Sequence, residues 1–254
     1  MALQLQSSAQ QDIIYPDSDG QPMADNTKQF ELIVLIKKNL DLLFANEPNV
    51  FVAGDLLWYP VEGDNKTRIA PDAMVAFGRP KGDRGSYQQW REDNIPPQVV
   101  FEILSPGNTI KEMSKKIRFY ERYGVEEYYL YNPDRVDLAG WLRSGDQLEI
   151  IEEMAGWVSP RLGVRFELEA GELVIYRPDG QRFATYLELA QQKEQAQQLA
   201  EQERLEKEQA QQRAIEQQQR AESAETLLEQ ERARSQALLA RLQELGINPD
   251  LLEQ

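Results

Sequence analysis

The sequence predicts an α/β (α+β) domain with a mixed central sheet flanked by helices, followed by a long C-terminal helix. In its first three quarters, a segment with helical periodicity, a group of β-type runs, a second helical segment and more β-type runs follow one another, with Gly and Pro turns between them. From Ala190 onward the composition shifts to Gln, Glu, Ala, Arg and Lys, and neither Gly nor Pro occurs until Gly246. We therefore expect four parts: an arm (1–25), a domain (26–188), a coiled-coil helix (189–245) and a tail (246–254).

Two segments of the domain have helical patterns. The first begins at Asn26 or Thr27, either of which can cap a helix, and apolar residues recur at helical spacing up to about Phe44. The second extends from about Asn108 to Tyr123, and Gly124 follows in the position of a C-terminal cap.

The β-type segments are short, rich in apolar residues and bounded by turn residues. The first is interrupted by Gly54, and the third is a nearly continuous apolar run. The expected strands are 50–59, 69–77, 98–104, 125–131, 138–143, 148–152, 165–168 and 173–176.

The C-terminal helix has a weak heptad pattern. A series at alternating spacings of four and three residues is apolar at Leu189, Ala196, Ala200, Ala210, Ala214, Ala221, Ala224, Leu228, Leu238, Leu242 and Leu245, and polar at Lys193, Glu203, Lys207, Gln217, Glu231 and Ser235. Such a seam predicts a loose coiled coil, on the order of 80 Å long, and with it a homo-oligomer such as a dimer. The alternative is a lone, solvated helix held by local ion pairs.

Composition restricts the chemistry. The chain has no Cys and no His, so disulfides, thiolate chemistry and histidine bases are excluded. Catalysis must then use carboxylates, Lys, Tyr or Ser, and a hard, oxygen-ligated cation such as Mg²⁺ is the natural metal for these groups. The net charge of −15 argues against a protein that coats nucleic acid, so nucleic-acid contacts would need local basic patches. With neither a membrane-spanning segment nor a secretory signal in view, we expect a cytoplasmic protein without membrane contact.

The acid with the strongest physical case is Glu102, which lies inside the apolar segment 98–104. Burying an unpaired carboxylate there would cost several kcal/mol, so a metal, a cation or solvent at one edge must compensate its charge. Asp72 follows Pro71 at the start of another expected strand and could reach the same pocket, although Pro-Asp is also a common turn pair.

The second helix carries cations on two faces. The residues that form a basic stripe are Lys111, Lys115, Arg118 and Arg122, whereas Met113, Ile117 and Tyr120 define an apolar face. Lys116 lies beside the apolar face, where it either delivers its ammonium to Glu102 or remains a surface lysine.

Residues 78–97 form a long polar segment between the two acids. It interleaves Arg79, Lys81, Arg84 and Arg91 with Tyr87 and Trp90. The basic side chains could contact phosphates and the aromatic ones could stack on bases, and we select Arg84 and Trp90 as candidates for contact with the substrate. Alternatively, this is a plain surface loop, because acidic residues lie among the basic ones.

Four short motifs follow one another in the chain: PD at 71–72, E-x-L-S-P at 102–106, K-x-x-x-Y at 116–120 and GVEEYYLYNP at 124–133. Their order resembles that of the Uma-two family, a large group of bacterial restriction-endonuclease-like proteins in the PD-(D/E)XK nuclease superfamily. The resemblance covers roughly residues 25–180. It implies a mixed sheet flanked by helices, with Asp72 and Glu102 as metal-binding acids on adjacent strands.

The match departs from the E-x-K pattern at one position, because Leu104 occupies the lysine slot. The resemblance implies that the lysine has moved to Lys116 on the next helix, in agreement with the helical-face argument. It also implies Glu31 as a possible further acid from the first helix.

These observations lead to a hypothesis of a metal-dependent endodeoxyribonuclease. Asp72 and Glu102 would bind Mg²⁺, or Mn²⁺, while Lys116 orients water or stabilises charge, and Lys111, Lys115, Arg118, Arg84 and Trp90 would contact DNA. The alternative is a weak or inactive nuclease fold that serves as an interaction module through its coiled coil. A carboxylate-only glycosidase is a third, less favoured possibility.

Overall fold

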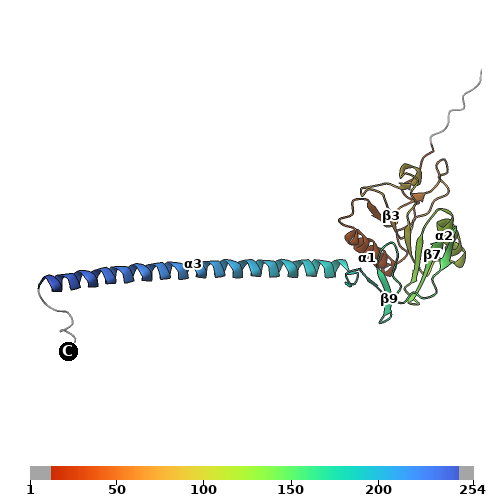
Figure 1. The fold of residues 1–254 in the computed structure, drawn as a ribbon. Helices are drawn as coiled ribbons and strands as arrows, with labels where there is room; N and C mark the ends of the chain where they lie inside the picture. The colour runs from red at the N-terminus through yellow and green to blue at the C-terminus, as the bar shows by residue number, and fades with distance from the viewer. Residues whose placement is uncertain (1–12, 246–254) are drawn as a thin grey trace, which may run out of the picture. The chain divides into compact units, whose positions relative to one another are not determined.

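The computed structural model describes residues 13–245, and the chain divides into two compact units at Tyr186 and Leu187. Among the described residues, the first unit holds two α-helices, α1 (Thr27–Leu43) and α2 (Ile110–Arg122), and one 3-10 helix, η1 (Gln89–Arg91) (Figure 1). Its strands are β1 (Val50–Ala53), β2 (Trp58–Tyr59), β3 (Ala73–Phe77), β4 (Tyr87–Gln88), β5 (Val99–Ile103), β6 (Glu127–Asn132), β7 (Asp137–Ser144), β8 (Gln147–Ile150), β9 (Arg165–Glu169) and β10 (Glu172–Tyr176).

The central sheet is mixed and has six strands in the order β1-β3-β5-β6-β7-β8. Its β5–β6 pair is parallel, and its other neighbouring strands are antiparallel. A parallel pair needs a crossover, and α2 supplies it between β5 and β6. The predicted fold class is thus confirmed. Strands β9 and β10 pair as a separate hairpin, and β2 pairs with β4 in a small parallel sheet.

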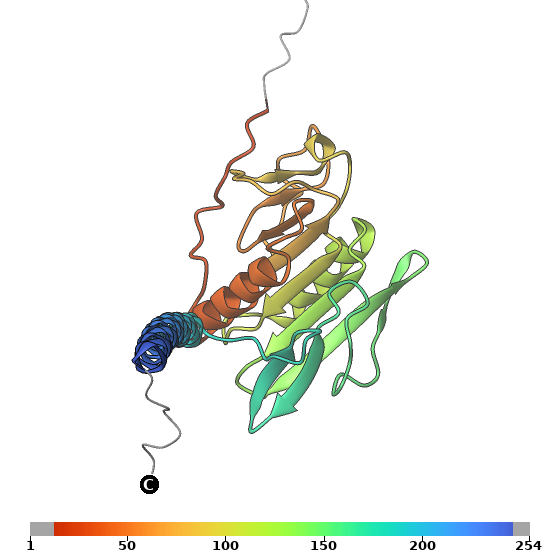
Figure 2. The same cartoon turned by 60° about the vertical axis from the view of Figure 1, so that its left-hand side comes forward.

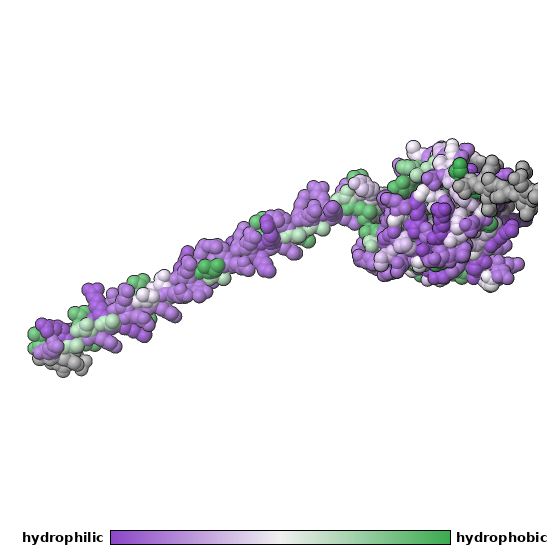
Figure 3. Space-filling model, turned by 90° about the horizontal axis from the view of Figure 1, so that it is seen from above, coloured by the Kyte–Doolittle hydropathy of each residue, from purple (hydrophilic) through white to green (hydrophobic). Residues whose placement is uncertain are grey.

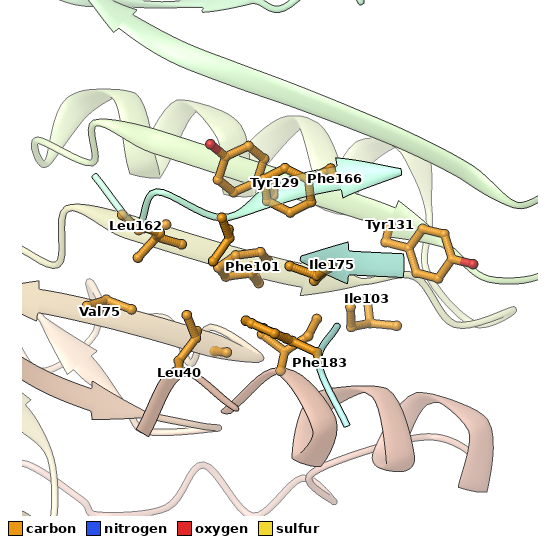
Figure 4. Packing of buried hydrophobic residues seen from close by; sticks show 14 of the residues in the cluster. Leu40, Val75, Phe101, Ile103, Tyr129, Tyr131, Leu162, Phe166, Ile175 and Phe183 are labelled. Carbon is orange, nitrogen blue, oxygen red and sulfur yellow. The ribbon is translucent and has the colours of Figure 1, made fainter. Parts of the chain in front are cut away.

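The two faces of the sheet carry separate cores, because side chains alternate along each strand. On one face, Val75, Phe101 and Tyr129 pack against α1 and the β9–β10 hairpin (Figures 2 and 4). On the other face, Met74 and Val100 belong to a second core with α2, β2 and β4, in which the large buried side chains are Trp58, Tyr87, Tyr120 and Tyr128. By the same alternation, Asp72 and Glu102 belong to the α2 face.

Local signals set the limits of both helices. The side chain of Asn26 accepts a hydrogen bond from Gln29 N and caps α1. Thr109 and Glu112 form a reciprocal capping box at the start of α2. After α2, Gly124 adopts a φ of +93°, a conformation that favours glycine, and the chain turns directly into β6.

Two expected strands differ from the observed ones. The segment 50–59 divides into β1 and β2, because the chain turns at Gly54 and Asp55, where Asp55 has a φ of +48°. The segment 69–77 is a strand only from Ala73; upstream, Ile69 forms an isolated bridge with Trp58. The segment 78–97 also contains β4 and η1, which its polar composition did not predict.

The second unit contains α3 (Tyr186–Glu244), a helix of 59 residues that begins three residues before the expected start. Its surface is mostly hydrophilic, with separate hydrophobic patches along its length (Figure 3). Leu228 and Leu238 of the heptad series are 52% and 58% exposed, so their apolar surface is available to another chain. Residues 246–254 of the expected tail, and residues 1–12 of the expected arm, lie outside the described residues. Within residues 13–245, no helix combines the length and the apolar character that crossing a bilayer requires.

The core under the hairpin can be tested at Phe166, whose side chain is 0% exposed and contacts Phe101 and Tyr129. Phe166→Ala should lower the free energy of unfolding by about 3–5 kcal/mol, because it removes buried apolar surface and leaves a cavity. Leu168→Ala, on the same strand but 41% exposed, should change it by less than about 1 kcal/mol. Urea unfolding followed by tryptophan fluorescence measures both, and equal losses in the two variants would contradict this packing.

Candidate active site

Strand register brings two carboxylates to the same edge of the sheet. Strands β3 and β5 are antiparallel, with Ala73 opposite Phe101, and one more residue in the same register places Asp72 opposite Glu102. The Oδ2 atom of Asp72 accepts a hydrogen bond of 2.6 Å from the backbone N of Ile103, which fixes the aspartate against β5. The two acids therefore face α2 from adjacent strands.

Glu102 is only 3% exposed, and α2 supplies both of its side-chain partners. Lys116 Nζ donates to Oε2 at 2.7 Å, and Tyr120 Oη donates to Oε1. Lys116 and Tyr120 are four residues apart and so lie on one face of the helix. The charge of the buried carboxylate is thus balanced by a cation and a hydroxyl.

Burial and neighbouring charges shift the pKa values of the groups around Glu102. Burial, followed by the charge of Glu102, raises the pKa of Asp72 to about 8. Burial lowers the pKa of Lys116, but the charge of Glu102 and its hydrogen bond outweigh this effect and raise that pKa overall. Burial and the charge of Glu102 raise the pKa of Tyr120 well above its ordinary value. At neutral pH, Lys116 is therefore a cation and Tyr120 a hydrogen-bond donor.

An open cavity of about 540 Å³ lies in front of this group. Its charged lining contains both signs, which distinguishes it from an ordinary acidic surface. The charged residues around it are Asp19, Asp25, Asp55, Lys66, Arg68, Asp72, Glu112 and Lys116.

Apart from Asp72 and Lys116, these residues were missed by the sequence analysis, and the ones beside the Pro-Asp segment are Asp55, Lys66 and Arg68. Burial raises the pKa of Asp55, as do the charges of Asp19 and Glu102, which places this acid within electrostatic reach of the site. The backbone N of Asp55 donates to Pro71 O at 3.0 Å, so the turn after β1 is held beside the Pro-Asp segment. The only sequence signal was the Gly-Asp pair that interrupts an apolar run.

Glu31 does not join the site. It is exposed on α1, whose apolar residues Ile33, Ile36 and Leu40 cover the opposite face of the sheet, and it does not line the cavity. The basic stripe of α2 is also exposed. Within residues 13–245, none of Lys111, Lys115, Arg118 and Arg122 forms an ion pair, although Arg122 lies over the ring of Tyr123.

The cations of the segment 78–97 are largely neutralised within it. Arg79 and Arg84 both donate to Glu92, at 3.0 Å and 2.6 Å, and Arg84 also lies over the ring of Phe51. Burial raises the pKa of Glu92, but the hydrogen bonds from Arg84 and Arg79 lower it overall. Arg84 lines a separate cavity with Lys37 and Lys81, whereas Trp90 packs against Tyr15 of the arm.

Residues 3–169 match the model of the Uma2 family, which is described as "Putative restriction endonuclease". The chain belongs to the Uma2 family. This Uma2 protein is also similar to a crystal structure described as "a putative nuclease belonging to DUF820" from Anabaena variabilis, with 17% identity and a TM-score of 0.41 over 55% of this chain and 74% of that chain. No curated protein matches the chain significantly.

Restriction-endonuclease-like proteins generally use a metal, and the donor set of this Uma2 protein fits a hard cation. Asp72 and Glu102 lie opposite each other, and burial, followed by the charge of Glu102, raises the pKa of Asp72. A divalent cation bound by both carboxylates would stabilise their charged forms. Among residues 13–245, no group of three or more Asp or Glu side chains is arranged to hold a metal ion. Mg²⁺ tolerates this arrangement, because it commonly binds one or two carboxylates and keeps several waters.

The raised pKa of Asp72 predicts a pH-dependent stability. An unfolded Asp releases its proton near pH 3.8, whereas folded Asp72 holds it up to about pH 8, so this group makes the metal-free protein less stable as pH rises between those values. Asp72→Asn keeps an acceptor for Ile103 N but does not titrate. Its free energy of unfolding relative to wild type should therefore increase by at least about 1 kcal/mol between about pH 5 and about pH 8.

Urea unfolding in EDTA across this pH range measures the difference. Asp146→Asn, in the exposed turn between β7 and β8, is the matched control and should follow the wild type at each pH. A constant difference between Asp72→Asn and wild type would exclude titration of Asp72 in this range.

Proposed function

We propose that this Uma2 protein is a Mg²⁺-dependent endonuclease that hydrolyses DNA phosphodiester bonds at Asp72, Glu102 and Lys116. The observation that carries the proposal is the opposition of two carboxylates across β3 and β5, with a buried lysine ammonium 2.7 Å from one of them, at the wall of an open cavity. Membership of a family described as restriction endonucleases supports the same reaction class.

The proposed site divides the work between two metal-binding acids, a lysine and a positioning tyrosine. Asp72 and Glu102 would hold Mg²⁺, or Mn²⁺, through carboxylate oxygens. When bound, the cation polarises the phosphodiester and lowers the pKa of a water molecule. Lys116 supplies a fixed positive charge that stabilises the charge developing on phosphate oxygens or orients the attacking water. Tyr120 donates to Glu102 Oε1 and holds that carboxylate in one orientation.

The lysine therefore reaches the site from α2 instead of from β5. Leu104 occupies the usual lysine slot, one residue after the end of β5, and lines a separate apolar cavity beside α2. Lys116 is 19% exposed, so its ammonium can meet a substrate at the cavity while its stem stays covered. The unpaired stripe of Lys111, Lys115 and Arg118 supplies cations for contacts with the DNA backbone.

Cleavage tests this proposal directly. Purified wild type should cut plasmid DNA with Mg²⁺ or Mn²⁺ and stop with EDTA, whereas Asp72→Ala and Lys116→Ala should each reduce the rate roughly 10²-fold or more. Lys38→Ala, at an exposed lysine of α1, and Asp146→Ala are matched controls for the loss of charge. If wild type cuts neither plasmid nor oligonucleotide, and Asp72→Ala leaves the affinity for Mn²⁺ unchanged, the nuclease proposal fails.

The second candidate function is an interaction module that works through α3. It is favoured by the occupation of both Glu102 oxygens by Lys116 and Tyr120, and by the exposed leucines of the helix. In this case the nuclease fold would be weak or inactive, and self-association through the heptad series would be the working property.

Self-association can be tested at two adjacent leucines. Leu238 belongs to the heptad series, whereas Leu239 lies one position outside it, and both are exposed. Leu238→Lys should weaken a dimer by roughly tenfold or more, because it places a charge in the seam, and Leu239→Lys should have a smaller effect. Sedimentation equilibrium of the full chain measures both, and a monomeric wild type would contradict dimerisation.

A further inference from the structure

The described part of the arm, residues 13–25, lies against the rest of the first unit, and its one aromatic side chain makes the most extensive contacts. The ring of Tyr15 lies between Tyr59 and Trp90, with ring centroids 5.2 Å and 4.9 Å away. Its Oη atom accepts a hydrogen bond of 2.7 Å from the backbone N of Gly63. The ring meets Tyr59 edge-to-face, at an interplanar angle of 81°, and Trp90 at a tilt of 52°. Tyr59 and Trp90 therefore form an aromatic site, here called the slot, that holds one ring.

Backbone carbonyls of the arm provide the next contacts. Asn65 Nδ2 donates to Ile14 O at 2.8 Å, and Tyr59 Oη donates to Pro16 O at 2.7 Å. The donors thus flank the slot and meet acceptors on both sides of the tyrosine.

After the slot, the arm follows the wall of the active-site cavity. Asp19 and Asp25 line this cavity, together with Lys66, Arg68 and Lys116. Figure 2 shows the arm as the red-orange trace that leads to the start of α1. A carboxylate-bearing segment therefore lies where a phosphate-bearing strand would have to pass to reach Asp72.

The arm contributes little to the hydrophobic core. Ile13, Ile14 and Met23 are 46%, 78% and 45% exposed. The end of the arm is held more firmly, because Ser105 donates to Asp25 and Ala24 packs against the core. Residues 13–19 are attached by one ring and a few hydrogen bonds, and segments with so few buried contacts open at low cost compared with global unfolding. Residues 13–19 can therefore leave the slot while the domain stays folded.

We propose that the arm is a built-in mimic of single-stranded DNA, and that a substrate strand must displace it to reach the site. The proposal rests on the nuclease function proposed above. The arm presents one ring with a backbone acceptor on each side, followed by a carboxylate at Asp19, and a strand of DNA likewise presents flat bases together with anionic acceptors. Aromatic side chains are the usual platform for stacked bases, and Lys and Arg side chains, here Lys66 and Arg68, are the usual partners of phosphates.

Under this proposal, Trp90 makes two contacts in succession, first with the arm and then with DNA. Among residues 13–245, it contacts Tyr15 in the arm-bound state, and it would stack on a base after the arm leaves. Asp19 would repel an entering phosphate until the arm moves, because its charge acts on the cavity, where it contributes to the raised pKa of Asp55 after burial.

The test is the affinity of the full chain for a short fluorescein-labelled single-stranded DNA, measured by fluorescence anisotropy in EDTA so that no cleavage occurs. Tyr15→Ala should bind this DNA roughly fivefold or more tightly than wild type, because the slot is no longer occupied. Asp19→Asn should also bind more tightly, whereas Asp146→Asn, with the same change of charge on the exposed β7–β8 turn, should not. Tyr15→Phe keeps the ring and should bind more like wild type than Tyr15→Ala does.

A double variant identifies the slot as the binding site. In the Tyr15→Ala background, Trp90→Ala should reduce the affinity for the DNA roughly fivefold or more. If Tyr15→Ala binds the DNA no more tightly than wild type, and urea unfolding shows that the variant is folded, the proposal that the arm mimics DNA is wrong. A gain of affinity that persists after Trp90→Ala would overturn the slot as its cause.

These outcomes are separate from those of the nuclease proposal. If Tyr15→Ala binds DNA more tightly and the protein never cleaves it, the mimic stands and the nuclease proposal fails. If Mg²⁺-dependent cleavage requires Asp72 but neither Tyr15→Ala nor Asp19→Asn changes DNA affinity, the nuclease proposal stands and the mimic fails.

Discussion

The charge of Glu102 inside β5 is the constraint on which the site depends. A carboxylate that is 3% exposed among apolar neighbours must be compensated within the fold, and Lys116 and Tyr120 do so from successive turns of α2. This requirement fixes the rotation of α2 about its own axis. With that face turned toward the sheet, the basic stripe is left exposed on the outer side of the helix.

Asp72 occupies the complementary position, because it has the burial of Glu102 without a cation of its own. Its hydrogen bond comes from the backbone of Ile103, and Lys116 is shared with Glu102. Asp72 is buried and lies near the charge of Glu102, but Lys116 forms its ion pair with Glu102 and not with Asp72, so the pKa of Asp72 is raised. With both acids ionised, the single lysine leaves one negative charge without a cation of its own, which is why the same geometry that costs stability in the metal-free protein suits metal binding.

Sequence periodicity was sufficient to predict the elements that position these residues, because α1, α2 and β5 have strong apolar patterns and clear caps. It also placed Lys116 beside the apolar face of α2, next to the sheet. Asp55, Lys66 and Arg68 could not be predicted in this way, because they lie outside the helices and strands, where periodicity gives no side-chain direction. Arg84 shows another limit of the sequence: its spacing suggested a contact with DNA, but nothing in it predicted the ion pair with Glu92, eight residues later, at 2.6 Å.

Net charge connects the site with the arm. A chain of net charge −15 repels a polyanion at long range, so DNA binding must depend on a few local cations. Lys66, Arg68 and Lys116 are such cations, but Asp19, Asp25 and Glu112 surround the same cavity and offset them. Displacement of the arm would take Asp19 away from the cavity, whereas Asp25 stays, because it accepts a hydrogen bond from Ser105 beside the start of α1. A divalent cation at Asp72 and Glu102 would also add positive charge to the cavity. Arm displacement and metal binding would then act in the same direction on DNA affinity, because each makes the potential in the cavity more positive.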